Sequence, residues 1–283
     1  MVWDATTSKK LVHTAVKAEL GYQACAAFEP TQGKLLAVSG HARIGLWKWQ
    51  AESAPKKWAA QNFTEKIIWR PDGQHFICRC RHSREIPLWD RNLVKKSLCN
   101  VPKDYHAPSA AWHPNGSRLL LTGGVTETPT PAKNSNQNIR HQWIKGRHVA
   151  WSSDGKHFVV TANSARGQYP HLRLYSAEGN RGPTLEGADR LFRLSQTDTL
   201  VAFTSDNKYA VAAIANRIIY WDIATGKLDR IVLMLKNDQL AIFSAAGELL
   251  FATPRAAEDL RYVVENKDGT IDLWTQNQFN KGR

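Results

Sequence analysis

The chain has 283 residues, of which 42% are hydrophobic and 22% are charged, and its formal net charge is +13. This balance is typical of a globular domain with a sizeable core and excludes a disordered segment. No apolar stretch approaches the roughly 18 residues of a membrane span, and the N-terminus, MVWDATTSKKLVHTAV, lacks a signal pattern. Four cysteines are too few for a disulfide scaffold, so we expect reduced thiols and a cytoplasmic protein with no membrane partner.

One sequence pattern repeats along the chain: an apolar strand, a turn with glycine or asparagine, and a second apolar strand. The strands before the turns are ACAAF, KIIW, SAAW, HVAW, LVAF and LAIF, and a third strand ends in an aromatic residue in EIPLWDR and RIIYWDI. Most turns lie about 40 residues apart, as in four-stranded propeller blades. Because these runs are apolar on both faces, we expect sheets stacked between sheets. The turn residues are Gly33, Gly73, Gly116, Gly155, Asn207 and Gly247.

These pieces resemble the WD40-repeat family, most clearly in IPLWDRN (86–92) and IIYWDIATGK (218–227). The resemblance implies an all-β propeller of six to seven four-stranded blades, with seven favoured. The repeats are degenerate, because the Gly-His pair that the family carries before the inner strand is absent. The C-terminal tail also resembles that of bacterial WD40-repeat proteins, some of which are fused to Ser/Thr kinases, although the chain has no kinase loop signature.

The repeats divide a single domain, 1–283, into blades. A propeller usually closes by sharing one blade between its termini, which removes the exposed sheet edges. We therefore predict that the N-terminal half-blade pairs with the C-terminal hairpin RYVVENKDGTIDLW. Alternatively the half-blade completes the sixth blade, or the chain belongs to a longer array. The expected units are a partial blade at 1–20 and blades at 21–60, 61–103, 104–147, 148–189, 190–236 and 237–283.

The sequence shows no catalytic constellation, because it has neither a phosphate-binding glycine loop nor a nucleophile elbow. Cys78, Cys80 and His82 in CRCRH suggest a metal site, but no second pair completes a set of four ligands. We interpret these cysteines as core residues. The prediction is a protein without enzymatic activity, cofactor or metal.

Cations recur in the connections between second and third strands. The family resemblance places these connections on one rim, which WD40 proteins often use for binding, and the glycine turns on the other. Arginine holds carboxylates and phosphates in two-pronged contacts, whereas the alternative interpretation is a solvated rim without a specific partner. Arg79 is distinctive because it lies in an apolar strand, where it needs a partner such as Glu85. The rim cations are Arg43, Arg79, Arg81, Arg84, Lys133, Arg140, Arg166, Arg217 and Arg255.

The tryptophans fall into two groups. Trp47, Trp89, Trp221 and Trp274 end third strands, where the family packs an indole between blades, so we expect them in the core. Two others, Trp58 and Trp143, are flanked by cations and are candidate partner-binding residues.

The leading hypothesis is a scaffold for protein partners with acidic or phosphorylated segments. The alternatives are electrostatic nucleic-acid binding, a propeller enzyme with an axial site, and a fragment of a longer WD40 protein.

Overall fold

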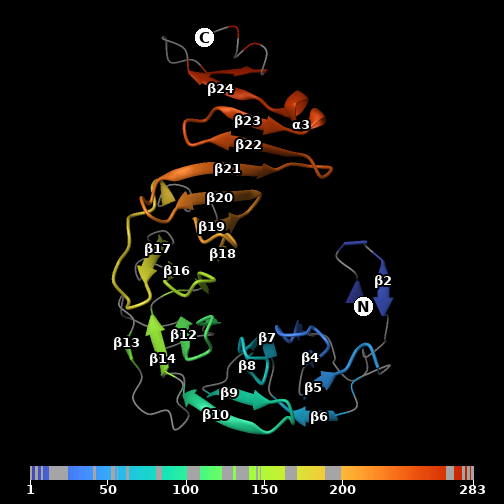
Figure 1. The fold of residues 1–283 in the computed structure, drawn as a ribbon. Helices are drawn as coiled ribbons and strands as arrows, with labels where there is room; N and C mark the ends of the chain where they lie inside the picture. Colours follow the sequence, from blue (N-terminus) through green and yellow to red (C-terminus); the bar gives the residue numbers. More distant parts are fainter. Residues whose placement is uncertain are drawn as a thin grey trace.

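The sheets follow one another along an arc, as the ribbon of the computed structural model shows (Figure 1). Each of the first three sheets contains four strands, and their connections fall where the sequence places the turns. The structure describes residues 2–3, 6–7, 9–12, 25–40, 43–51, 55, 57–61, 64–80, 85–100, 109–122, 130–131, 140–144, 146, 148–162, 171–188, 199–265, 271–275, 278 and 281.

The first sheet contains β3 (Cys25–Phe28), β4 (Leu36–Ser39), β5 (Arg43–Trp47) and β6 (Lys57–Ala60). The second contains β7 (Thr64–Trp69), β8 (His75–Cys80), β9 (Glu85–Asp90) and β10 (Lys95–Asn100). The third contains β11 (Ala110–Trp112), β12 (Arg118–Thr122), β13 (Thr130–Pro131) and β14 (Arg140–Ile144), and the fourth contains β15 (His148–Trp151), β16 (His157–Ala162) and β17 (His171–Ser176).

The first strand of each sheet lies on the inner side of the arc. β3 contacts β7, β7 contacts β11, β11 contacts β15, and β15 contacts β18 (Leu200–Phe203). The remaining strands of each sheet extend outward from this inner row (Figure 1). This radial arrangement is that of a β-propeller and confirms the predicted all-β fold.

The repeated turns are confirmed in detail. All six predicted turn residues have a positive φ, between 56° at Asn207 and 83° at Gly247. Five of them donate their backbone N–H to the carbonyl oxygen three residues earlier, as Gly73 does to Arg70 at 2.9 Å. Glycine and asparagine are the residues that adopt this left-handed backbone at least cost, which explains why they recur here.

Apolar clusters fill the spaces between consecutive sheets. Ile77 and Leu88 of the second sheet pack with Trp112 and Leu119 of the third. The expected core indoles Trp47, Trp89 and Trp221 are 3%, 2% and 0% exposed, which confirms their placement. Cys78 is fully buried and not disulfide-bonded, in the cluster between the first two sheets.

The C-terminal region departs from the expected blades. β18, β19 (Tyr209–Ile214), β20 (Arg217–Asp222) and β21 (Leu228–Met234) continue in the same sheet into β22 (Leu240–Ser244) and β23 (Leu249–Ala252). The blade boundary expected at residue 237 therefore falls inside one six-stranded sheet. The reason is local pairing, since β22 joins β21 across a short turn from Leu235 to Gln239.

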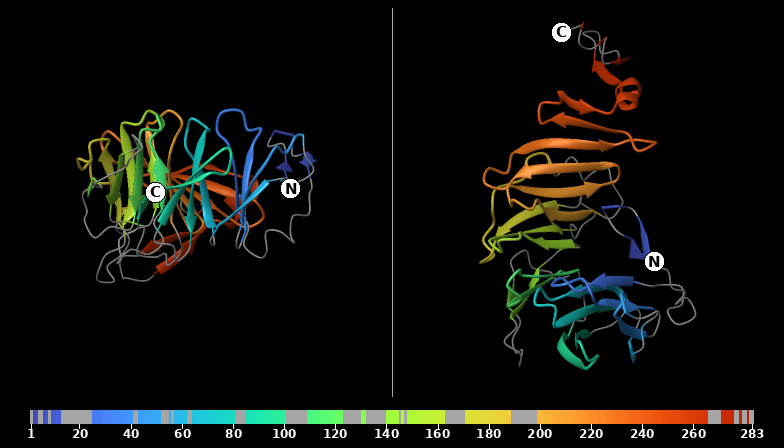
Figure 2. Two further views of the ribbon diagram at one scale, coloured as in Figure 1. Left: turned by 90° about the horizontal axis from the view of Figure 1, so that it is seen from below. Right: turned by 45° about the vertical axis from the view of Figure 1, so that its right-hand side comes forward.

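The described termini also differ from the expected closure. β1 (Val2–Trp3) pairs with β2 (Lys10–Val12), and β24 (Tyr262–Glu265) pairs with β25 (Ile271–Trp274), each as a separate two-stranded sheet. The C-terminal strands lead away from the arc, and β2 lies beside its other end (Figures 1 and 2). Trp274, expected in the core, is only half-buried. Among the described residues, no helix is long and apolar enough to cross a membrane.

Candidate interaction surfaces

Two of the predicted rim cations lie where the sequence places them. Arg43 begins β5 and is exposed, and Arg217 begins β20 and is half-buried, both at the end of the sheet away from the glycine turns. Arg255 is exposed on α3 (Pro254–Asp259), directly after β23. The ladder from Arg217 through Leu233 and Ala241 to Ala252 places the end of β23 on that same rim, three strands farther out.

The position of Arg140 differs from the prediction. β14 runs parallel to β12, so that Arg140 is the register partner of Arg118, which directly follows the third glycine turn. β14 therefore begins at the glycine-turn end of the sheet. The Arg140 backbone lies on the rim opposite to the predicted one. The side chains of Arg140 and Trp143, and all of Arg81, Arg84, Lys133 and Arg166, lie outside the described residues.

Trp58 also differs from the prediction. It lies in β6, where it is half-buried against Trp47 in an apolar cluster of the first sheet. Its ring covers Gly45 so closely that a Cβ added there would be 2.8 Å from Trp58 Cε3. Because Gly45 and Trp58 are register partners on β5 and β6, this indole packs on its own sheet and remains partly exposed.

Arg79 has a cationic neighbour that sequence inspection missed. Lys66 on β7 is the register partner of Arg79 on β8, so both side chains leave the same face of the sheet. Desolvation of the ammonium group and the charge of the Arg79 guanidinium together lower the pKa of Lys66. The pair lies near the end of β8. Two positive charges therefore lie side by side near this end of the second sheet.

On the opposite rim, side chains connect each turn to the next sheet. Arg70 Nε donates to the carbonyl oxygen of Gly116 at 2.9 Å, and His113 Nε2 lies 3.1 Å from the carbonyl oxygen of Gly155. Ser153 donates its backbone N–H to Asn207 Oδ1 at 2.7 Å. We call these contacts the turn interlocks. They join the second sheet to the third, the third to the fourth, and the fourth to the fifth.

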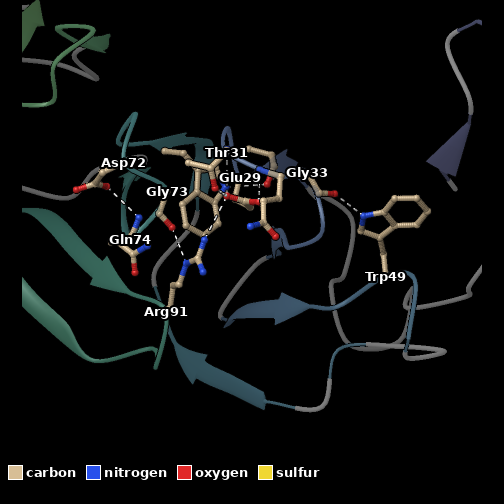
Figure 3. A network of polar contacts seen from close by, with 11 residues as sticks. Glu29, Thr31, Gly33, Trp49, Asp72, Gly73, Gln74 and Arg91 are labelled. Carbon is tan, nitrogen blue, oxygen red and sulfur yellow. Dashed lines mark hydrogen bonds and ion pairs between the residues drawn. The ribbon is translucent and has the colours of Figure 1, made fainter.

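Glu29 forms the corresponding link between the first two sheets (Figure 3). Its carboxylate, 2% exposed, accepts hydrogen bonds from the hydroxyl and backbone N–H of Thr31 at 2.5 and 3.1 Å and from the backbone N–H of Gln32 at 2.7 Å. Arg91 reaches Glu29 Oε2 at 3.2 Å and donates through Nε to the carbonyl oxygen of Gly73 at 2.6 Å. Arg91 thus joins the buried carboxylate to the next turn.

These contacts set the ionisation of Glu29. Burial by itself would raise the pKa, but the hydrogen bonds from Thr31 and Gln32 and the charge of Arg91 outweigh it and lower the pKa of Glu29. The carboxylate is therefore ionised at neutral pH, and it is fully occupied by donors of its own surroundings. It is a structural anion rather than a general base.

A cavity of about 280 Å³ opens beside this network. Three cations from separate segments line it: Lys34 from the turn of the first sheet, Lys48 directly after β5, and Arg91 directly after β9. Leu35 and Ala51 supply apolar surface to the lining. A second cavity, of about 230 Å³, lies in the fourth sheet between β17 and the segment 181–188. Within the described part of the chain, no group of His, Cys, Asp and Glu residues is arranged to hold a metal ion.

The turn interlocks have a sequence signal that could have been found. Arg70 and His113 stand three residues before their turn glycines, and Ser153 stands two residues before Gly155. These positions vary in residue type, and alignment on the glycines alone treats them as ordinary turn residues. Their partners are 42 to 54 residues distant, so only the stacking of the sheets identifies the contacts.

Comparisons with known proteins support the fold. The chain is similar to Kuenenia stuttgartiensis hydrazine synthase, with a TM-score of 0.51, 10% identity, and coverage of 89% of this chain and 94% of that one. It is also similar to the β-propeller domain of Myceliophteria thermophila Cps50 (Swd1), with a TM-score of 0.52, 16% identity, and coverage of 88% and 82%. No family model and no curated protein matches. The strands, their radial order and these likenesses together establish a β-propeller fold.

Proposed function

We propose that this chain is a non-enzymatic propeller scaffold whose rim at the second-to-third connections binds acidic or phosphorylated protein segments. The observation that carries the proposal is the pair of Lys66 and Arg79 on adjacent strands. Like charges directly opposite each other in a ladder destabilise the sheet. An anionic segment bound at this pair would interact with both charges at once, which supports the proposal.

The surroundings of the pair favour a partner of protein size. Ile77 and Ile68, on the same face of the sheet, pack in the apolar cluster between the second and third sheets. Lys66 and Arg79 therefore project from paired strands, next to the packed interface between the second and third sheets, and not from a loop. Arg43, Arg217 and Arg255 extend the basic surface along the same rim. Rigid placement of charge lowers the ordering cost of binding.

The test is capture of proteins from a cell lysate, with and without nuclease, across a salt series. We expect defined proteins to persist after nuclease treatment and at moderate salt, and to be lost when Lys66→Gln and Arg79→Gln are combined. The matched control is Lys156→Gln with Lys227→Gln, which removes two exposed lysines from the opposite rim and leaves the same net charge as the first double variant.

Equal loss in the two double variants contradicts the proposal, because the total charge then decides binding. Recovery that disappears with nuclease and falls steeply with salt instead supports electrostatic nucleic-acid binding, since phosphate contacts release counterions. Melting temperatures of both double variants, measured in parallel, separate lost binding from lost folding.

A further inference from the structure

The cavity beside Glu29 is a second basic site, and it is independent of the proposed rim. It lies at the glycine-turn end of the first two sheets, whereas Lys66 and Arg79 lie at the other end. Its lining holds three cations and one carboxylate, a net charge of +2. Glu29 accepts hydrogen bonds from Thr31, Gln32 and Arg91, so its negative charge is already compensated.

Arg91 is held in a fixed orientation at this cavity. Its Nε donates to Gly73 and its Nη2 to Glu29, and neither bond uses Nη1. A guanidinium fixed at two positions presents its remaining donors without paying for their ordering. The side chain of Arg91 is 39% exposed, so that these donors are within reach of a ligand in solution.

The other polar groups of the lining complement Arg91. Lys34 and Lys48 are exposed at the cavity and come from the two ends of the β4–β5 hairpin. Gln32 and Gln50 add amide donors. A volume of about 280 Å³ is below that of most drug-sized sites and suits one compact group.

We propose that this cavity binds a phosphomonoester group. A dianionic phosphate matches the net charge of the lining, and its three terminal oxygens accept from Lys34, Lys48 and Nη1 of Arg91 together. Leu35 and Ala51, which line the cavity, supply apolar surface for the carbon atoms that carry the phosphate. The phosphate belongs either to a phosphorylated protein segment or to a small metabolite, since both present the same group.

Isothermal titration of the full chain with inorganic phosphate, O-phospho-L-serine and a short phosphoserine peptide tests this proposal. We expect the phosphomonoesters to bind, with the affinity increasing as the pH rises through about 6, where the second proton leaves the phosphate. Tighter binding of the peptide than of the free amino acid identifies a protein segment as the source. Equal affinities identify a small molecule.

The critical variant is Lys34→Gln combined with Lys48→Gln, because both lysines are exposed and their loss leaves the Glu29 network intact. We expect phosphate affinity to fall at least tenfold. The matched control, Lys156→Gln with Lys227→Gln, removes two exposed lysines from the same rim near other turns and should change affinity less than twofold. Equal loss in both variants, or no binding of any of the three probes, overturns the proposal. Thermal melting verifies that both variants fold.

Discussion

The same repeat of strand, turn and strand is packed differently in the N-terminal sheets and in the C-terminal sheet. From the first to the fifth sheet, each turn is connected to a neighbour by Glu29 and Arg91, Arg70, His113 or Ser153. At Gly247 the turn has the same left-handed backbone, but its backbone hydrogen bonds run within its own sheet, from Gly247 to Ser244 and from Ala245 to Asp229. There β22 pairs edge to edge with β21.

This difference shows what a repeat needs in order to form a blade. The local turn forms wherever the glycine and its flanking strands occur, because it depends only on short-range hydrogen bonds. Stacking additionally requires an apolar face and a side chain that reaches the next turn. Where these contacts are missing, apolar side chains stay exposed, as for Val263, Ile271 and Leu273, which are 65–69% exposed.

The largest expected effect comes from removing an interblade indole. Trp89→Ala should lower the free energy of unfolding by about 3–5 kcal/mol, because the side chain is 2% exposed and truncation leaves a cavity. Trp274→Ala, at a half-buried position in the exposed hairpin of β24 and β25, should cost much less. Urea denaturation of both variants measures the difference. Similar losses would mean that the two regions are equally well packed.

The turn glycines give a second comparison. Gly73→Ala should cost about 2–4 kcal/mol, because alanine is strained at a positive φ and its Cβ would lie 2.7 Å from Glu29 Oε2. Gly33→Ala has nearly the same φ, 63° instead of 66°, and no neighbouring atom within 4 Å, so only the backbone strain of about 1–2 kcal/mol applies. Thermal melts of the two variants isolate the contribution of the interlock. If the two costs are equal, the neighbouring sheet contributes nothing at this turn.

The smallest effect is expected in the acid range. The folded protein lowers the pKa of Glu29, so the stability that its carboxylate contributes is present above the unfolded value of about 4.3 and is lost as the pH falls towards the folded pKa. In Glu29→Gln this part of the pH dependence should disappear. Glu248→Gln, in the exposed C-terminal turn, controls for the removal of one carboxyl group. Parallel stability curves for wild type and Glu29→Gln between pH 5 and pH 3 would argue against the assigned pKa.

Sequence patterns predicted the strands, the turns and most of the core because these depend on local chemistry. Short runs of apolar residues locate the strands. A glycine or asparagine supplies the positive φ at each of the six repeated turns. Trp47, Trp89 and Trp221 could be assigned to the core for the same reason. The rim cations Arg43 and Arg217 followed from their position beside third strands.

Tertiary structure alone decided the contacts that bring distant segments together. The chain carries Glu29 and Arg91 in different repeats, and only sheet stacking places the carboxylate, the guanidinium and Gly73 in one network. Because β14 runs parallel to β12, the Arg140 backbone lies on the other rim. The indole of Trp58 packs over Gly45. The six-stranded C-terminal sheet likewise reflects a competition between edge pairing and stacking. Local sequence does not decide between them, because the same strands can pair at a sheet edge or stack on a neighbouring sheet.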